Sequence, residues 1–319
     1  MLTELINEEQ FKALFHEEKE RRGKLVSNCL LPSKAVQKAL SEGRVYLKQL
    51  QQGLALFCAE GDHAPYYRLL YFFEENAQMT GLGMDKPVLL EEPDRNDRRA
   101  AYLSNLEPRL ERAGFRKVAK NYVVEIAVPQ PKENKERLRS LQEQMDARGY
   151  RTVVDPSGKQ LEEAFALWRG FLKPTDLPQE HFEIGKNGAH LVCLLDQNDN
   201  VCGVNRWETH DGNCEIRHTV TSPNCLRQGI GMYLSLYVLE HAEQEHARVG
   251  IGFFDETNFR SIAMLEKVGF RKSGKIILQY LLPAQNGANK IKERMLLWKN
   301  CSVFGRKSVR TWTLKRKRN

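Results

Sequence analysis

An eleven-residue segment that occurs twice constrains the fold of this chain more than any other feature. Residues 110–120 read LERAGFRKVAK and residues 265–275 read LEKVGFRKSGK, with seven of the eleven positions identical. The second copy begins 155 residues after the first, about half of the 319-residue chain. In both copies a helical pattern ends at a glycine, which suits a left-handed C-terminal cap, and a phenylalanine follows. We therefore expect two copies of one domain, a division that the length also favours.

The segments around the repeat support this division. In each half an amphipathic helix precedes two strands that are separated by a polar turn. The helices are expected at 8–22 and 158–172, the strand pairs at 44–58 and 190–208, and one further strand after each copy of the repeat. Residues 129–150 begin with two prolines and continue as a charged helix, which is typical of a linker. The expected fold class is α/β (or α+β), with a mixed central sheet flanked by helices in each of two tandem domains.

Positive charge is concentrated at the C-terminal end. The formal net charge is +8, and residues 301–319 hold seven basic residues and no acidic ones, so the remainder is close to neutral. We place a first domain at 1–128, a linker helix at 129–148, a second domain at 149–300 and a basic tail at 301–319. A basic nucleic-acid-binding body is excluded, and nucleic acid is expected to bind only through the tail.

The spacing of the cysteines and the length of the apolar segments indicate the cellular compartment and whether a metal site is expected. The seven cysteines are widely spaced without a C-x-x-C pair, which is typical of reduced thiols. No apolar run reaches the ~18 residues of a membrane span, and the N-terminal segment is acidic, which predicts a cytoplasmic protein without membrane contact. Zinc sites use tight ligand pairs on turns, so no metal is expected at the densest cluster, which is His210, Cys214, His218 and Cys225.

Residues 215–247 combine a strand, a glycine turn and a helix. The strand is EIRHTV, the turn is SPNCLRQGIG, and the helix begins with GMYLSLYVLEHAEQ. A strand that passes through glycines into a helix start directs several free backbone N–H groups at one point, where the helix dipole adds positive potential. This segment is therefore expected to bind a pyrophosphate group.

A second motif follows the strand GIGFF at 250–254. The combination of V-x-x-P…G-I-G with N-x-x-S-x-x-x-x-x-x-x-G-F at 258–270 closely resembles the GNAT superfamily of acetyl-CoA-dependent N-acetyltransferases. The resemblance spans about residues 150–300. With the repeat, the whole chain resembles the tandem-domain GNAT proteins, the N-terminal copy being divergent.

The resemblance implies a site for acetyl-CoA as cosubstrate. Backbone amides of the turn and helix start would hold its pyrophosphate, namely those of Arg227, Gln228, Gly229, Ile230, Gly231 and Met232. Thr219, Val220 and Thr221 would pair with the pantetheine arm, and the Thr219 N–H would face the thioester carbonyl as an oxyanion donor. Asn258 stands where the family has an Asn whose side chain contacts the cofactor region.

The N-terminal copy lacks the combination of a glycine turn and a following helix that would bind the cofactor. Residues 74–86 separate its strand YYRLLYFF from PVLLEEP, too few for a loop, a helix and a turn. Gly81 and Gly83 lie there without a helical segment after them. The first half is therefore expected not to bind acetyl-CoA, and to act as a scaffold or as one wall of the acceptor site.

Acetyl transfer requires a neutral amine and a polarised thioester. Glu215 stands where some family members carry a general-base glutamate, and strand alternation places Glu215, Arg217 and Thr219 on one face. The alternative is a strand-edge glutamate that pairs with Arg217 or with solvent. His218, expected on the other face, is a second candidate base. Further candidates are Asp255 and Glu256.

Two positions depart from the family pattern. Leu226 replaces the usual Arg or Gln three positions before the first glycine, and Leu265 replaces the tyrosine that serves some members as general acid. The tyrosines that could take over, each also explained by packing, are Tyr233, Tyr237 and Tyr280.

The leading interpretation is an N-acetyltransferase in which a small-molecule or peptide amine attacks acetyl-CoA directly. No motif identifies the acceptor, the acyl chain preference or the oligomeric state. The alternative is a non-catalytic CoA-binding module whose basic tail meets a nucleic-acid or protein partner. A third interpretation, aminoacyl transfer from charged tRNA, would require a basic groove, and the near-neutral body argues against it.

Overall fold

The structure, a computed structural model, describes residues 3–22, 26–27, 33–51, 53–59, 66–74, 81–93, 106–171, 184–185 and 188–284. The basic tail lies outside the described residues. The first half consists of β1 (Thr3–Leu5), α1 (Glu8–Arg22), β2 (Val26–Ser27), α2 (Ser33–Ser41), β3 (Val45–Gln49), β4 (Gly53–Ala59), β5 (Tyr67–Glu74), β6 (Val88–Pro93), α3 (Leu106–Arg112) and β7 (Arg116–Ala127). The helix expected at 8–22 and the strand pair expected at 44–58 are confirmed.

The second half begins with the helix expected as a linker. Its elements are α4 (Lys132–Ala147), β8 (Arg151–Val154), α5 (Gly158–Arg169), β9 (Ala189–Leu195), β10 (Val201–His210), β11 (Asn213–Thr221), η3 (Pro223–Cys225), α6 (Ile230–Gln244), β12 (Val249–Asp255), α7 (Phe259–Val268) and β13 (Arg271–Leu282). The strand, turn and helix expected between 215 and 247 are confirmed as β11, η3 with its following loop, and α6.

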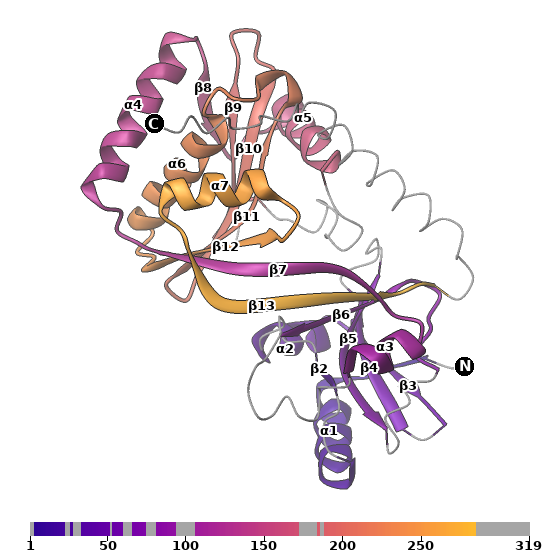
Figure 1. Cartoon of the computed structure of the whole chain (residues 1–319). Coiled ribbons are helices and arrows are strands. Elements are labelled where there is room, and N and C mark those ends of the chain that lie inside the picture. Colours follow the sequence, from indigo (N-terminus) through magenta and orange to yellow (C-terminus); the bar gives the residue numbers. More distant parts are fainter. Residues whose placement is uncertain are drawn as a thin grey trace, which may run out of the picture.

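The described strands form one sheet, in which each half contributes its last strand to the other half. The order is β1-β3-β4-β5-β6-β13-β7-β12-β11-β10-β9-β8, and β2 pairs separately with β5. β13 is antiparallel to β6, and β7 is antiparallel to β12. The two exchanged strands run side by side across the middle of the molecule (Figure 1). Neither half therefore completes its part of the sheet alone.

β7 and β13 are also the strands that follow the two copies of the repeat. The helices before them, α3 and α7, are followed by Gly114 and Gly269, whose φ angles are 91° and 108°. These left-handed values are those expected of the two caps. Because β7 and β13 are antiparallel partners, an approximate twofold axis between them relates the two copies. The exact domain limits stay a prediction, since the strands before and after residues 128–149 belong to one continuous sheet.

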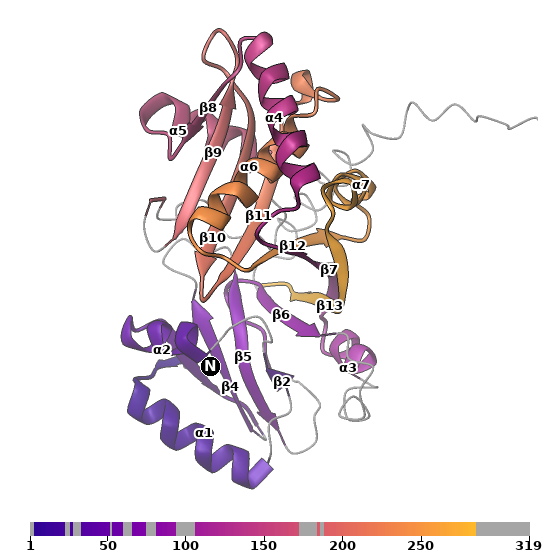
Figure 2. The same cartoon turned by 90° about the vertical axis from the view of Figure 1, so that its left-hand side faces the viewer.

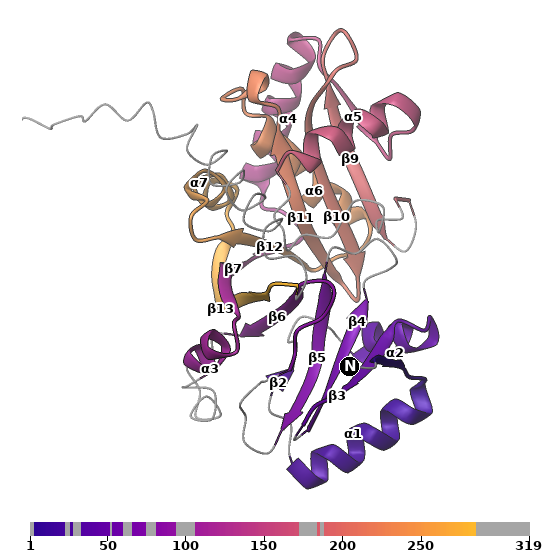
Figure 3. The ribbon, with the colours of Figure 1, turned by 90° about the vertical axis from the view of Figure 1, so that its right-hand side faces the viewer.

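Helices cover both faces of this sheet. In the second half α4, α6 and α7 pack on one face, which we call the α6 face, and α5 packs on the other, the α5 face. Figures 2 and 3 view the molecule from opposite sides and show α6 and α5 on opposite sides of β9–β11. Among the helices of the described residues, none is long and apolar enough to cross a membrane.

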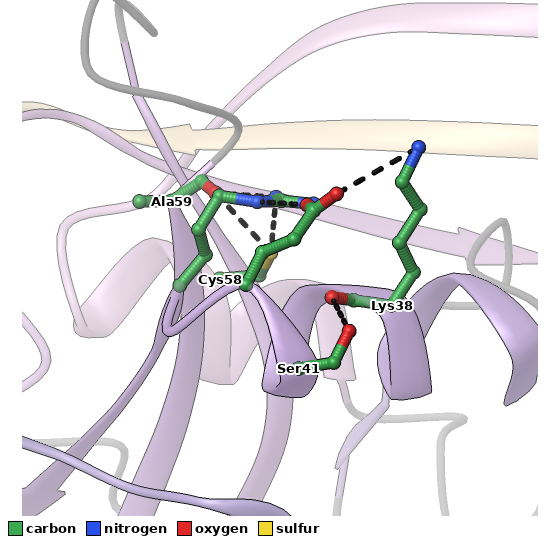
Figure 4. Close-up of polar contacts among 6 residues, drawn as sticks. Lys38, Ser41, Cys58 and Ala59 are labelled. Atoms are coloured by element: carbon green, nitrogen blue, oxygen red, sulfur yellow. Dashed lines mark hydrogen bonds and ion pairs between the residues drawn. The ribbon is translucent and has the colours of Figure 1, made fainter.

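Polar contacts connect α2, the turn that follows it and β4 in the first half (Figure 4). Arg44 donates from Nη1 to the carbonyl oxygen of Ala59 at 2.7 Å, and the same atom lies 3.5 Å from Cys58 Sγ. Arg44 Nη2 pairs with Glu42 at 2.6 Å, and Glu42 Oε1 lies 3.8 Å from Lys38 Nζ of α2. These contacts join the end of α2 to the β3–β4 hairpin, which suits the scaffold role expected of this half.

Candidate active site

The parallel strands β11 and β12 pair over only part of their length. Their register runs from Asn213 opposite Val249 to Ile216 opposite Gly252. Among the described residues, 218–221 of β11 pair with β10 alone. The side of these residues that faces away from β10 is called the open edge below, and its backbone groups can pair with a ligand.

The corresponding edge of the first half is covered by the chain itself. β5 is parallel to β6 at Tyr67 and Arg68, and then pairs with β2 at Tyr71 and Phe72. β2 therefore occupies the position beside β5 that corresponds to the open edge beside β11. The pairing of β2 with β5 leaves no room for a ligand at this edge of the first half, and the sequence did not indicate it.

Alternate residues of β11 direct their backbone groups to the open edge. Ser222 N donates to Cys202 O at 2.8 Å, which continues the β10–β11 ladder. Every second residue of an antiparallel strand bonds to the same neighbour, so Val220 also faces β10 whereas Thr219 and Thr221 face the open edge. The side chain of Val220 packs in the core beneath α5. Thr219 and Thr221 are thus placed to pair with an extended arm, and Val220 is not.

The glycine turn after β11 has the backbone geometry of an anion-binding loop, and residues 227–232 are called the anion loop below. Arg227 and Gly229 have left-handed φ angles of 64° and 83°. Within the described part of the chain no side chain caps α6, whose first intrahelical bond runs from Tyr233 N to Gly229 O at 2.9 Å. The amides at 230–232 therefore have no partner within the helix. Such turns direct successive N–H groups to one side, which favours an anion.

The two glycines of the anion loop serve different purposes. A Cβ at Gly229 would lie 3.2 Å from Leu141 Cδ2 of α4, and its φ disfavours any other residue. A Cβ at Gly231 would lie 3.7 Å from Thr221 Oγ1 and 4.0 Å from Thr219 Cγ2, which are side chains of two residues at the open edge. The anion loop and the open edge therefore adjoin on the α6 face, and Gly231 keeps the space between them free of a side chain.

β11 contains a bulge at Arg217. Arg206 of β10 lies opposite His218, but Trp207 lies opposite Ile216, so Arg217 is an extra residue in β11. Opposite residues of an antiparallel pair share a face, and an extra residue reverses the alternation beyond it. The expected assignment of faces, which assumed strict alternation, needs correction.

Glu215 and His218 lie on the same face. The sequence neighbours of Glu215 on both sides pack beneath α6, so Glu215 points to the α5 face. The ring of His218 lies on that face too, 4.9 Å from Trp168 of α5. The expectations that Glu215 shares a face with Thr219, and that His218 points away from Glu215, are wrong because of the bulge.

Glu215 belongs to an ion-pair network. Its Oε2 pairs with Arg217 Nη2, and its Oε1 lies 3.6 Å from His210 Nε2. Arg217 Nη2 also lies 3.9 Å from Glu208 Oε2, and its guanidinium is 5.6 Å from the ring of Phe253. The Glu215 side chain is 18% exposed, so part of it is open to solvent. The pairing with Arg217 that was the alternative for Glu215 is present, and a role as base stays a prediction.

The buried guanidinium of Arg206 is connected to this network through Glu208. Arg206 is 2% exposed, pairs with Glu208 and lies 6.0 Å from the ring of Trp168. Burial lowers the pKa of Arg206 to about 10, an effect that the charge of Glu208 opposes. Sequence reasoning missed both residues, although charges inside the apolar strand segment VNRWE at 204–208 were an available signal.

The other predicted residues have structural partners. Asn258 is the N-cap of α7, and its Oδ1 accepts a hydrogen bond from Ser261 N at 3.2 Å. Leu265, at the position of the family tyrosine, is 6% exposed in the core. Among the described residues no group of three or more His, Cys, Asp or Glu could hold a metal ion, and Cys214 and His218 lie on opposite faces.

The three tyrosines considered as acids are engaged in packing. The Tyr233 hydroxyl bonds to Thr152 Oγ1 at 2.7 Å and to Gln142, and burial raises the pKa of Tyr233 to about 12. The ring of Tyr237 lies 4.5 Å from that of His241, tilted by 50°. Tyr280 is 2% exposed in the core of the first half.

Comparison with known proteins supports the family resemblance in the second half. The sequence profile of the Acetyltransferase (GNAT) family matches residues 159–270, which include β11, the anion loop and α7. No curated protein matches the chain in sequence.

Solved structures share the fold over most of the chain. A GCN5-related N-acetyltransferase from Kribbella flavida has a TM-score of 0.50 at 14% identity, covering 80% of this chain and 95% of its own. One from Sphaerobacter thermophilus has a TM-score of 0.51 at 11% identity, with coverages of 89% and 96%. A tandem GNAT protein from the clavulanic acid biosynthesis pathway has a TM-score of 0.51 at 10% identity, with coverages of 90% and 100%. At these identities the likeness concerns the fold alone.

Proposed function

We propose that the protein transfers an acetyl group from acetyl-CoA to an amine, starting from the match of residues 159–270 to the GNAT acetyltransferase family. The observation that carries the proposal is the position of the anion loop beside the open edge of β11. The loop amides suit a diphosphate, and the open edge suits an extended arm with amide groups. The matching edge of β5 is covered by β2, so one such site is proposed, in the second half.

The site residues have separate tasks in the proposed transfer. When bound, acetyl-CoA would supply the thioester carbon that the amine attacks, and the C–S bond would break so that CoA leaves as a thiolate that takes a proton from solvent. The backbone N–H of Thr219, which faces the open edge, would donate to the carbonyl oxygen as negative charge develops there. Glu215 would take a proton from an amine that approaches on the α5 face, directly or through water, with His218 as the other candidate on that face.

Thermal denaturation of the full chain tests the cofactor part of the proposal. The full chain is required because β7 and β13 are exchanged between the halves. A ligand at 100 times its Kd stabilises the folded state by about 2.7 kcal/mol, so acetyl-CoA is expected to raise Tm by several degrees. No shift at millimolar acetyl-CoA would contradict the proposal.

A screen of amines that is read by release of free CoA thiol tests the transfer itself. With an acceptor in hand, Glu215→Gln is expected to remove the acid limb of the pH–rate profile. The matched control is Glu240→Gln, an exposed carboxylate of α6. An unchanged profile in Glu215→Gln would exclude Glu215 as the base and leave His218→Gln as the next variant.

A non-catalytic CoA-binding module is the second candidate function. Two observations favour it: Leu265 fills the position of the family tyrosine inside the core, and Arg217 engages Glu215. Tight CoA binding without thiol release across the amine screen would support this candidate. The basic tail would then be its contact to a nucleic-acid or protein partner.

A further inference from the structure

The linker helix α4 ends against the anion loop. Arg148, at the C-cap of α4, donates from Nη1 to the carbonyl oxygen of Gln228 at 3.2 Å. Tyr150 donates its hydroxyl to Gln228 Oε1 at 2.7 Å. Leu141 of α4 packs where a Cβ at Gly229 would lie, 3.2 Å from its Cδ2. Two hydrogen bonds to Gln228, and Leu141 beside Gly229, thus place residues 141–150 against two successive residues of the anion loop.

The end of α4 is itself firmly placed. Tyr150 N donates to the carbonyl oxygen of Met145 at 2.9 Å, and Met145 is completely buried. Gly149 makes the turn with a left-handed φ of 73°. Gln197 Nε2 donates to the carbonyl oxygen of Arg148 at 3.2 Å. Residues 148–150 therefore form a fixed support for the anion loop.

A carbonyl that is held on one side fixes the direction of the next amide. The C=O of Gln228 and the N–H of Gly229 belong to one planar peptide and point in opposite directions. Arg148 holds the carbonyl on the α4 side, so the Gly229 N–H points away from α4. The guanidinium also adds positive charge beside the loop.

We propose that Arg148 and Tyr150 are positioning residues for the diphosphate of the cofactor. Arg148 holds the carbonyl of the peptide between Gln228 and Gly229, and Tyr150 holds the Gln228 side chain, so that the Gly229 amide is presented to a phosphate oxygen. The inference rests on the proposed function and deepens it. It extends the cofactor site to residues that precede the family match at 159–270, so the linker takes part in binding.

Isothermal titration of the full chain with CoA and with dephospho-CoA tests this inference. Both ligands carry the diphosphate, but only CoA carries the 3′-phosphate. Tyr150→Phe removes one hydroxyl and is expected to raise both Kd values by about fivefold, and Arg148→Gln by about tenfold. The matched controls are Arg139→Gln, exposed on the same helix, and Tyr237→Phe, and we expect both to bind like the wild type.

The possible outcomes separate the inference from the proposed function. Equal losses for the two ligands, with unliganded Tm values near that of the wild type, support positioning of the diphosphate. Wild-type affinity in both variants overturns the inference and leaves the proposed function in place. A loss for CoA alone in Arg148→Gln also overturns it, because Arg148 would then contact the 3′-phosphate. A wild-type chain that binds neither ligand refutes the proposed function itself.

Discussion

Replacement of Gly229 by alanine tests whether the anion loop depends on its left-handed backbone. At φ of 83° an L-residue costs about 1–2 kcal/mol, and the new Cβ, 3.2 Å from Leu141 Cδ2, forces a small shift as well. Gly212, in the turn between β10 and β11, is a matched control with φ of 77°, where a Cβ would have no neighbour within 4 Å. Both substitutions are expected to lower the free energy of unfolding by about 1–2 kcal/mol, with the larger loss at Gly229.

Only Gly229→Ala is expected to weaken CoA binding. Relief of the backbone strain rotates the neighbouring peptides, so that at least one amide no longer points at the phosphate. A hydrogen bond to a charged group contributes about 1.5–3 kcal/mol, so Kd is expected to rise at least about tenfold. Urea denaturation and titration calorimetry on the same preparations measure the two effects. If Gly229→Ala loses stability as Gly212→Ala does but binds CoA like the wild type, the anion loop is not the diphosphate site.

Three further results are expected. Gln279→Leu removes the amide that donates to buried Glu91 Oε1 at 2.8 Å, and is expected to lower the free energy of unfolding by about 1–3 kcal/mol in urea. The pKa of Glu243 is lowered mainly by its hydrogen bond from Lys135. The ionised Glu243 therefore stabilises the folded state above its unfolded pKa of about 4.3, and this contribution is lost as pH falls through the folded pKa. Lys135→Met should therefore make Tm less sensitive to acid below pH ~4.3. Tyr233→Phe removes a hydroxyl bonded within the core and is expected to cost about 1 kcal/mol in thermal denaturation.

Most elements of the fold could be predicted from the sequence because their signals are local. The helical pattern before Gly114 and Gly269, and the apolar strand after each, depend on neighbouring residues alone. The exchange of β7 and β13 could not be predicted. Strand pairing is set by contacts between distant segments, and either strand could in principle have completed its own half. The repeat predicted two similar domains, but it did not indicate that the sheet of each would include the last strand of the other.

The same distinction applies to the site. Glycines at a helix start and free helix amides are local features, so the anion loop could be recognised from residue types. The bulge at Arg217 could not, because an extra residue in β11 exists only relative to β10. Strict alternation therefore placed Glu215 and His218 on different faces. The contacts of Arg148 and Tyr150 with Gln228 join segments about eighty residues apart, and no motif marks them.

The two halves differ at one strand edge, which is covered by β2 at β5 and open at β11. Unpaired backbone groups at an edge need a partner from the chain, from solvent or from a ligand. In the first half β2 pairs with β5 and supplies that partner, and no helix follows β5 before β6 in the described residues 81–87. In the second half the edge of β11 adjoins the start of α6, where a diphosphate can be held. An edge without an anion loop has little to bind, so covering it with β2 stabilises the first half without loss of a site. The second half still needs the first, because β7 of the first half pairs with β12. This pairing fixes the position of β12, the strand that separates from β11 where the open edge begins.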